Sequence, residues 1–136
     1  MDKVSTNTEQ PRPRWFIDLD WLQQNNRSFS VLAQTCLCPK CHERLKAEKE
    51  EILADDLLST IRECCSKTPG FITPKLPILE SMFRLLLANG NQPLDLEELE
   101  RQLSKWWGGD VYRISTETLS CLLSHDQYYG LSQVQS

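Results

Sequence analysis

The residues of this chain whose types and spacing could do chemistry are its cysteines. Cys38 and Cys41 form a C-x2-C pair, and Cys36 lies two residues before it. Cys64 and Cys65 follow after 22 and 23 intervening residues. A tight C-x2-C turn can place two thiolates about 2.3 Å from one zinc ion, which takes four such ligands in a tetrahedron. We therefore predict one zinc ion bound by Cys36, Cys38, Cys41 and one of the later pair, with Cys64 taken as the ligand.

The same pattern leaves other assignments open. Clustered cysteines could supply the four thiolates of an iron–sulfur cluster, although zinc is the commoner occupant of a small C-x2-C knuckle. Cys65 or His42 could replace one of the four ligands. Cys64 and Cys65 could also belong to the core, because a free cysteine packs as a small apolar side chain. A thioredoxin-like redox site would need a βαβ context that is absent here, and Cys121 is expected to pack rather than to bind metal.

The chain between the two cysteine groups decides whether they can share an ion. If residues 43–65 formed one unbroken helix, Cys64 would lie about 30 Å from Cys41, at a rise of about 1.5 Å per residue. Asp55 and the aspartate after it are suited to the first turn of a new helix, where carboxylates face the positive end of the helix dipole. We therefore predict that the charged stretch 45–54 forms a loop, which lets Cys64 return to the cluster.

The composition is that of a globular protein with one domain, or one domain and a small annex. The 136 residues are 40% apolar and 25% charged, which is ordinary for such proteins. No run of 18 apolar residues predicts a membrane span, and the first ten residues lack the apolar core of a signal peptide. We therefore expect a cytoplasmic protein, in which six cysteines indicate metal or redox chemistry before disulfide bonds.

The charge distribution argues against a polyanionic ligand, and the motifs argue against catalysis. Residues 76–136 hold 4 Lys/Arg and 8 Asp/Glu, which accounts for the whole net charge of −4. This balance provides no basic footprint for nucleic acid. The chain has two histidines and no GxGxxG, P-loop, GxSxG or HExxH pattern, so few general-base schemes are available. We expect no enzymatic activity.

The N-terminal half is predicted to contain an arm, a strand and several helices. The polar residues 1–14 should form a disordered or extended arm. Alternating apolar residues over 15–21 favour a short strand, with Asp20 as an alternative helix cap. Ser28 is suited to cap a helix over 29–35, whose inward residues would be Phe29, Leu32 and Ala33.

The C-terminal half is predicted to form three helices. The most apolar run of the chain, Pro77–Gly90, should be a helix surrounded by other elements, with its final glycine as a left-handed stop. Asp95–Glu98 reads as a capping box for a second helix, and Ser115 as the cap of a third. Short strands are expected at Val111–Arg113 and at Tyr128–Leu131.

Residues 76–131 resemble a winged-helix domain. The resemblance is carried by Leu79–Leu87 in the first helix, Pro93–Leu99 at the start of the second and Ile114–Leu119 at the start of the third. Tyr128–Leu131 looks like the first wing strand. In DNA-binding winged helices the third helix enters the major groove. The resemblance then implies that the exposed positions of this helix are Thr116, Glu117, Ser120 and Ser124.

The third helix lacks the side chains that bind DNA tightly. Residues 114–136 contain no Lys or Arg, although contacts from those side chains to phosphate supply much of the affinity of DNA-binding proteins. We therefore predict that this helix does not read the major groove. Winged helices also serve as protein-docking modules, and an acidic surface suits that use.

These patterns together predict a mainly α protein with small β elements. Its parts are the arm 1–14, a cysteine-rich metal-binding helical module at 15–70 and a winged-helix-like domain at 71–136. Such a pairing resembles accessory proteins of transcription. We expect a non-enzymatic zinc-binding factor associated with transcription or nucleic acid, with a protein partner and no membrane. The alternatives are a protein–protein adaptor that binds no nucleic acid, and a thiol or iron–sulfur redox protein.

Overall fold

The computed structural model describes residues 13–46, 52–108 and 114–134. Over these ranges the protein is mainly α-helical with one small sheet, as the sequence predicted. No helix in the described ranges is long and apolar enough to cross a membrane. In chain order the elements are β1 (Arg14–Ile17), α2 (Leu19–Gln24), α3 (Phe29–Gln34), α4 (Pro39–Lys46), α5 (Ala54–Glu63), a 3-10 turn η1 (Cys65–Lys67), α6 (Ile78–Ala88), β2 (Leu94–Asp95), α7 (Leu96–Trp106), α8 (Thr116–Ser124) and β3 (Leu131–Gln133).

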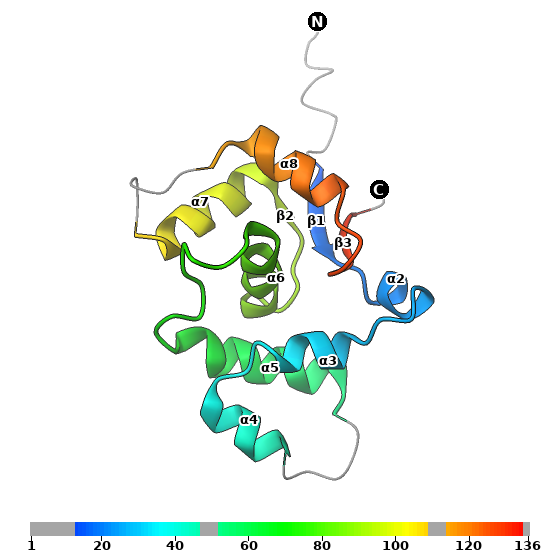
Figure 1. Ribbon diagram of the computed structural model, residues 1–136, viewed down its shortest axis with the longest axis vertical. Coiled ribbons are helices and arrows are strands. Elements are labelled where there is room, and N and C mark those ends of the chain that lie inside the picture. The colour runs from blue at the N-terminus through cyan, green and yellow to red at the C-terminus, as the bar shows by residue number, and fades with distance from the viewer. Residues whose placement is uncertain (1–12, 47–51, 109–113, 135–136) are drawn as a thin grey trace, which may run out of the picture.

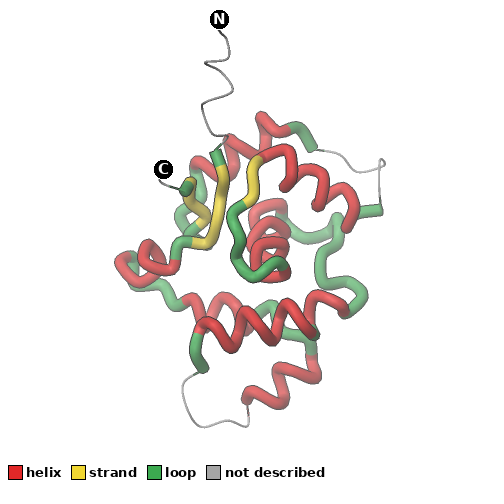
Figure 2. The backbone as a smooth tube through the Cα atoms, turned by 180° about the vertical axis from the view of Figure 1, so that it is seen from behind, coloured by secondary structure: helices red, strands yellow, loops and turns green. Residues whose placement is uncertain are grey.

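The sheet joins the two ends of the chain. Its strand order is β2-β1-β3, and β1 runs antiparallel to both neighbours. Trp15 pairs with Leu94 on one side and with Gln133 on the other. Figure 2 shows the three strands gathered at the same end of the molecule as α7 and α8. β1 is therefore the central strand of a sheet whose other described members lie in the C-terminal half.

β1 is shorter than the strand predicted over residues 15–21. The side chain of Asp18 accepts a hydrogen bond from the backbone N–H of Trp21 at 3.1 Å. An aspartate in this position starts a helix by satisfying one of the first unpaired N–H groups. The strand therefore ends at Ile17, and Asp20, considered as the cap from sequence, lies in the first turn of α2 instead.

α3 has the predicted start and the predicted buried face. The Ser28 hydroxyl accepts a hydrogen bond from the N–H of Val31 at 3.2 Å. Phe29, Leu32 and Ala33 are buried. The capping side chain and the apolar spacing thus predicted the start of this helix correctly, and its end to within one residue.

α6 is the central helix, and Figure 1 shows it in the middle of the molecule, between α7 and α5. Its buried apolar residues are Met82, Phe83 and the run Leu85–Leu87. The helix ends at Ala88, and Gly90, two residues later, has a φ of +76°. The N–H of Gly90 returns to the Leu87 carbonyl at 3.2 Å, and that of Asn91 to the Leu86 carbonyl at 2.7 Å, which closes the last turn as expected for a left-handed stop.

The caps predicted for α7 and α8 are both present. The Asp95 carboxylate accepts a hydrogen bond from the N–H of Glu98 at 2.8 Å. The Ser115 hydroxyl accepts one from the N–H of Thr118 at 3.2 Å. These bonds fix where the two helices begin. The strand predicted at Val111–Arg113 lies outside the described residues.

β3 begins later than the strand predicted at 128–131. The Asp126 carboxylate accepts hydrogen bonds from the N–H groups of Tyr128, Tyr129 and Leu131 at 3.0 to 3.2 Å. These bonds wind the segment into a turn and leave Tyr128 49% exposed. Strand pairing therefore starts only at Leu131, opposite Ile17.

One hydrophobic core runs through the described chain. It includes Trp15 and Ile17 of β1, Leu45 of α4, Ile61 of α5 and Leu131 of β3, together with the buried face of α6. The boundary predicted between residues 70 and 71 therefore does not separate two cores. β1 in particular was grouped with the cysteine-rich module from sequence, yet it pairs with strands of the C-terminal half.

Candidate metal centre

Two helix ends bring the cysteines together. Cys38 immediately precedes α4, and Cys41 lies in the first turn of that helix. Cys64 is the C-cap residue that follows α5, and Cys65 begins η1. Helix α5 starts anew at Ala54 after two non-helical residues, so the predicted interruption is present. The loop predicted over 45–54 is too long at both ends, because residues 45 and 46 belong to α4 and residue 54 to α5; its residues 47–51 lie outside the described ranges. Figure 1 shows α4 lying beside α5, which is the arrangement that lets Cys64 return to the C-x2-C pair.

Three thiols are placed as ligands of one ion would be. The sulfur atoms of Cys38, Cys41 and Cys64 all lie within 4.8 Å of one another. The Cys38 and Cys64 sulfurs are 3.9 Å apart. Two thiolates on one tetrahedral zinc ion would be about 3.8 Å apart, given Zn–S bonds of about 2.3 Å. The three side chains could therefore hold a metal ion with little rearrangement.

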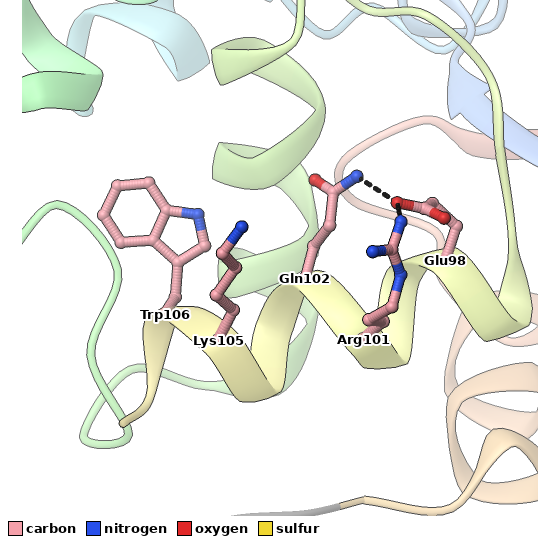
Figure 3. A pocket seen from close by; sticks show the side chains of 5 residues that line it. All are labelled: Glu98, Arg101, Gln102, Lys105 and Trp106. Atoms are coloured by element: carbon pink, nitrogen blue, oxygen red, sulfur yellow. Dashed lines mark hydrogen bonds and ion pairs between the residues drawn. The ribbon is translucent and has the colours of Figure 1, made fainter. Parts of the chain in front are cut away.

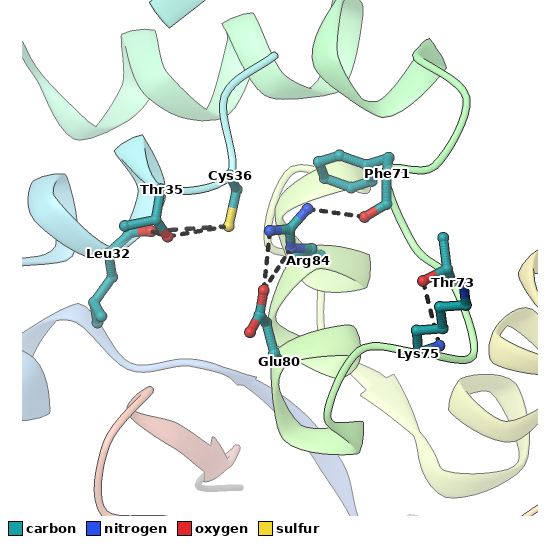
Figure 4. A network of polar contacts seen from close by, with 8 residues as sticks. All are labelled: Leu32, Thr35, Cys36, Phe71, Thr73, Lys75, Glu80 and Arg84. Carbon is teal, nitrogen blue, oxygen red and sulfur yellow. Dashed lines mark hydrogen bonds and ion pairs between the residues drawn. The ribbon is translucent and has the colours of Figure 1, made fainter. Parts of the chain in front are cut away.

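Cys36 does not join this group, although it was predicted to be a ligand. Its sulfur lies 3.8 Å from the Leu32 carbonyl oxygen and 3.8 Å from the Thr35 hydroxyl, as Figure 4 shows. The N–H of Cys36 still bonds to the Ala33 carbonyl at 3.0 Å, so the residue continues the turn of α3. Its side chain consequently points back along α3, and burial raises the pKa of its thiol.

Cys65 is the fourth thiol beside the group. Its sulfur lies 3.5 Å from that of Cys38 and accepts a hydrogen bond from the N–H of Cys38 at 3.2 Å. The residue is fully buried. The sequence offered Cys65 as a possible ligand, because it is adjacent to Cys64. Spacing alone, however, could not show that Cys65 is a better ligand than Cys36.

The remaining candidates lie outside the centre. His42, considered as a replacement ligand, is exposed, and its N–H bonds to the Cys38 carbonyl at 2.8 Å within α4. Cys121 is exposed on α8, so the expectation that it packs in the core was wrong. All six cysteines are free thiols.

The thiols of the centre differ in acidity. The backbone N–H of Cys41 donates a hydrogen bond to the Cys38 sulfur, and this bond is the main reason that the pKa of Cys38 falls to about 6. Hydrogen bonding to Cys41 and Cys38 raises the pKa of Cys64 to about 11. Burial raises the pKa of Cys65 to about 12. One thiolate therefore forms readily, whereas further thiolates repel it unless a cation is bound among them.

The positions expected to be exposed on the third helix are only partly so. Glu117 and Ser124 of α8 are exposed, whereas Thr116 and Ser120 are half-buried. None of the four carries a positive charge, so the described face of α8 has no cation for a phosphate group.

Comparison with protein-family models, with curated proteins and with solved structures finds no match to this chain.

Proposed function

We propose that the protein is a non-enzymatic zinc-binding adaptor, in which the metal holds the α3–α4 connection against the end of α5. The observation that carries this proposal is the convergence of the Cys38, Cys41 and Cys64 sulfurs within 4.8 Å. Thiolates in a tetrahedral set select zinc or iron–sulfur clusters among biological metals. With Cys65 as the fourth ligand the set would be closed, which is the form taken by structural zinc sites rather than catalytic ones.

We also propose that the C-terminal half is a winged helix, which is supported by the order of the elements. α6, β2, α7, α8 and β3 follow one another as the helices and strands of a winged helix do, and β1 takes the central place in the sheet. In this reading β1 takes the place of the third strand beside β2 and β3. The fold alone does not decide between DNA and protein as the partner. The absence of cations on the described face of α8 favours protein.

A metal analysis tests the proposal. Protein purified anaerobically should contain one zinc ion per chain, and Cys41→Ser should lose the ion and melt at a lower temperature. Cys121→Ser is the matched control, because Cys121 is exposed and lies on α8; it should keep both zinc and melting temperature. If the protein instead contains iron and absorbs visible light, the centre holds an iron–sulfur cluster and not zinc. The metal site would be refuted if the unaltered chain is purified without metal, melts at the same temperature as Cys41→Ser and is not stabilised by added zinc.

The second candidate is an accessory factor that associates with nucleic acid. It is favoured by the same order of elements and by two exposed cations on α7, Arg101 and Lys105. A titration of the chain with duplex DNA distinguishes this factor from the adaptor, which should bind duplexes only weakly.

A further inference from the structure

One face of α7 carries a depression of about 510 Å³. It is lined by Glu98, Arg101, Gln102, Lys105 and Trp106. Figure 3 shows the side chains of Gln102, Lys105 and Trp106 projecting to the same side of the helix, with Arg101 and Glu98 one turn further along. The spacing of three and four residues places these side chains next to one another on the helix surface.

The cations of this depression stand out against an acidic background. Residues 76–136 contain four basic side chains and carry the whole net charge of −4. Arg84 is one of the four, but it is bonded to the Glu80 carboxylate at 2.9 Å and to the Phe71 carbonyl at 3.0 Å. Among the described residues of this segment, Arg101 and Lys105 are the exposed cations. They lie four residues apart on one helix face.

Trp106 provides an apolar anchor beside these cations. Trp106 is 36% exposed, although tryptophan is usually well buried. Its ring lies 6.0 Å from that of Phe71, centroid to centroid, so one neighbour orients it. Tryptophan and arginine are the side chains most enriched at the energetic centres of protein interfaces. An oriented, partly exposed tryptophan next to two cations therefore has the composition of a docking site.

The depression already binds a carboxylate. The Glu98 carboxylate accepts a hydrogen bond from the Gln102 amide at 2.8 Å and pairs with the Arg101 guanidinium. The side-chain group of Arg101 is nevertheless 70% exposed. A surface ion pair of this kind contributes little to stability, because water screens both charges. A carboxylate of a partner protein can therefore pair with Arg101 beside Glu98 or in its place. Lys105 lies one helical turn from Arg101 and can pair with a second carboxylate.

We propose that this face of α7 docks an acidic peptide segment of a partner protein, with carboxylates on Arg101 and Lys105 and an apolar side chain on Trp106. The inference rests on the proposed adaptor function and names the surface that performs it. A peptide suits the charges better than nucleic acid does. DNA presents one negative charge per about 1.7 Å and needs several phosphate contacts, whereas this face offers two cations and places Glu98 among them.

The test is a selection with the zinc-loaded 136-residue chain against a library of random twelve-residue peptides displayed on phage. Enriched peptides should carry several Asp or Glu residues and at least one large apolar side chain. Synthetic copies, labelled and titrated by fluorescence anisotropy, should bind at least tenfold more weakly to the double variant Arg101→Glu/Lys105→Glu. Trp106→Ala should weaken binding similarly.

The matched control is Arg44→Glu/Lys46→Glu, which reverses two exposed charges on α4, at the other end of the molecule in Figure 1. It should bind the peptides as the unaltered chain does. Because Trp106→Ala also removes a contact with Phe71, the charge-reversal variant is the decisive one if that protein melts early.

Three outcomes would overturn the inference, and they differ in what they leave standing. Enriched peptides that bind the Arg101→Glu/Lys105→Glu variant undiminished would move the docking surface elsewhere and leave the adaptor function intact. A failure to enrich any peptide would overturn both the surface and the adaptor function, while the zinc content would be unaffected. Binding of a 20-base-pair duplex that disappears in the same variant, without peptide binding, would make this face a nucleic-acid contact.

Discussion

The side chain of Asn91 forms two hydrogen bonds with the backbone of Ile17. The Asn91 Oδ1 atom accepts from the Ile17 N–H at 2.8 Å, and its Nδ2 atom donates to the Ile17 carbonyl at 2.9 Å. β2 contains only Leu94 and Asp95, and the residue before it, Pro93, has no N–H to offer a neighbouring strand. The amide of Asn91 thus pairs with β1 where β2 cannot, and it ties the end of α6 to the N-terminal strand.

Replacing Asn91 should destabilise the protein through two separable effects. Asn91→Gly keeps the left-handed backbone, for which φ is +63°, and loses only the paired amide. We expect it to lower the free energy of unfolding by about 1 to 3 kcal/mol, because two part-buried groups of Ile17 lose their partners. Asn91→Ala should cost about 1 kcal/mol more, because alanine resists positive φ. Urea denaturation of both variants measures the difference; equal stabilities for the unaltered chain and Asn91→Gly would show that the Asn91–Ile17 bonds contribute nothing.

The pH dependence of zinc affinity should identify the fourth ligand. Zinc binds thiolates, so each ligand that is still protonated in the free protein must release a proton. Since the pKa values of Cys64 and Cys65 are raised to about 11 and about 12, both are protonated between pH 6 and pH 8. Each of them that binds zinc should therefore raise the affinity about tenfold per pH unit over this range.

Competition titrations with a chelator, at several pH values, measure this slope. In Cys65→Ser the slope of log affinity against pH should fall by about one compared with the unaltered chain. Cys36→Ser serves as the comparison, and its slope should not change. The opposite result, a changed slope in Cys36→Ser only, would restore Cys36 as the ligand predicted from sequence.

Removing the Phe83 ring from the centre of α6 should be strongly destabilising. The side chain is 1% exposed and packs against Phe29 at 6.5 Å and Tyr129 at 5.0 Å between ring centroids. We expect Phe83→Ala to cost about 3 to 5 kcal/mol of unfolding free energy. Val31→Ala is a suitable control, because Val31 is 62% exposed and should change the thermal melt little. A Phe83→Ala melt within error of the unaltered chain would contradict the assignment of the core.

α8 should not read the DNA major groove. Its exposed Glu117 and Ser124, and its half-buried Thr116 and Ser120, cannot neutralise phosphate, and the surrounding segment is acidic. The full chain is the right material, because β1 completes the sheet. It should bind random and genomic duplexes no better than weakly in low salt. Submicromolar, sequence-selective binding that is lost on changing Ser120 and Ser124 to Asp would disprove this prediction and favour a transcription factor.

The features that the sequence alone determined are local ones. Ser28, Asp95 and Ser115 each cap a helix because a capping bond joins residues three apart, which any reader of the chain can locate. The apolar run at 78–88 predicted a surrounded helix for a similar reason, since its periodicity is contained in the helix itself. The aspartate pair at 55 and 56 marked the break before α5.

Tertiary structure alone decided which distant groups meet. Spacing favoured Cys36 as a ligand and left Cys65 as a replacement, but the turn at the end of α3 directs Cys36 away, while the end of α5 places Cys65 against Cys38. Strand pairing in the sheet could not be predicted from the sequence either. β1 pairs with strands about 80 and 117 residues further along the chain, and a local sequence pattern does not predict which distant strands pair. Pairing of that kind is settled by burial of Trp15 and Ile17 in the shared core, which exists only once the whole chain has folded.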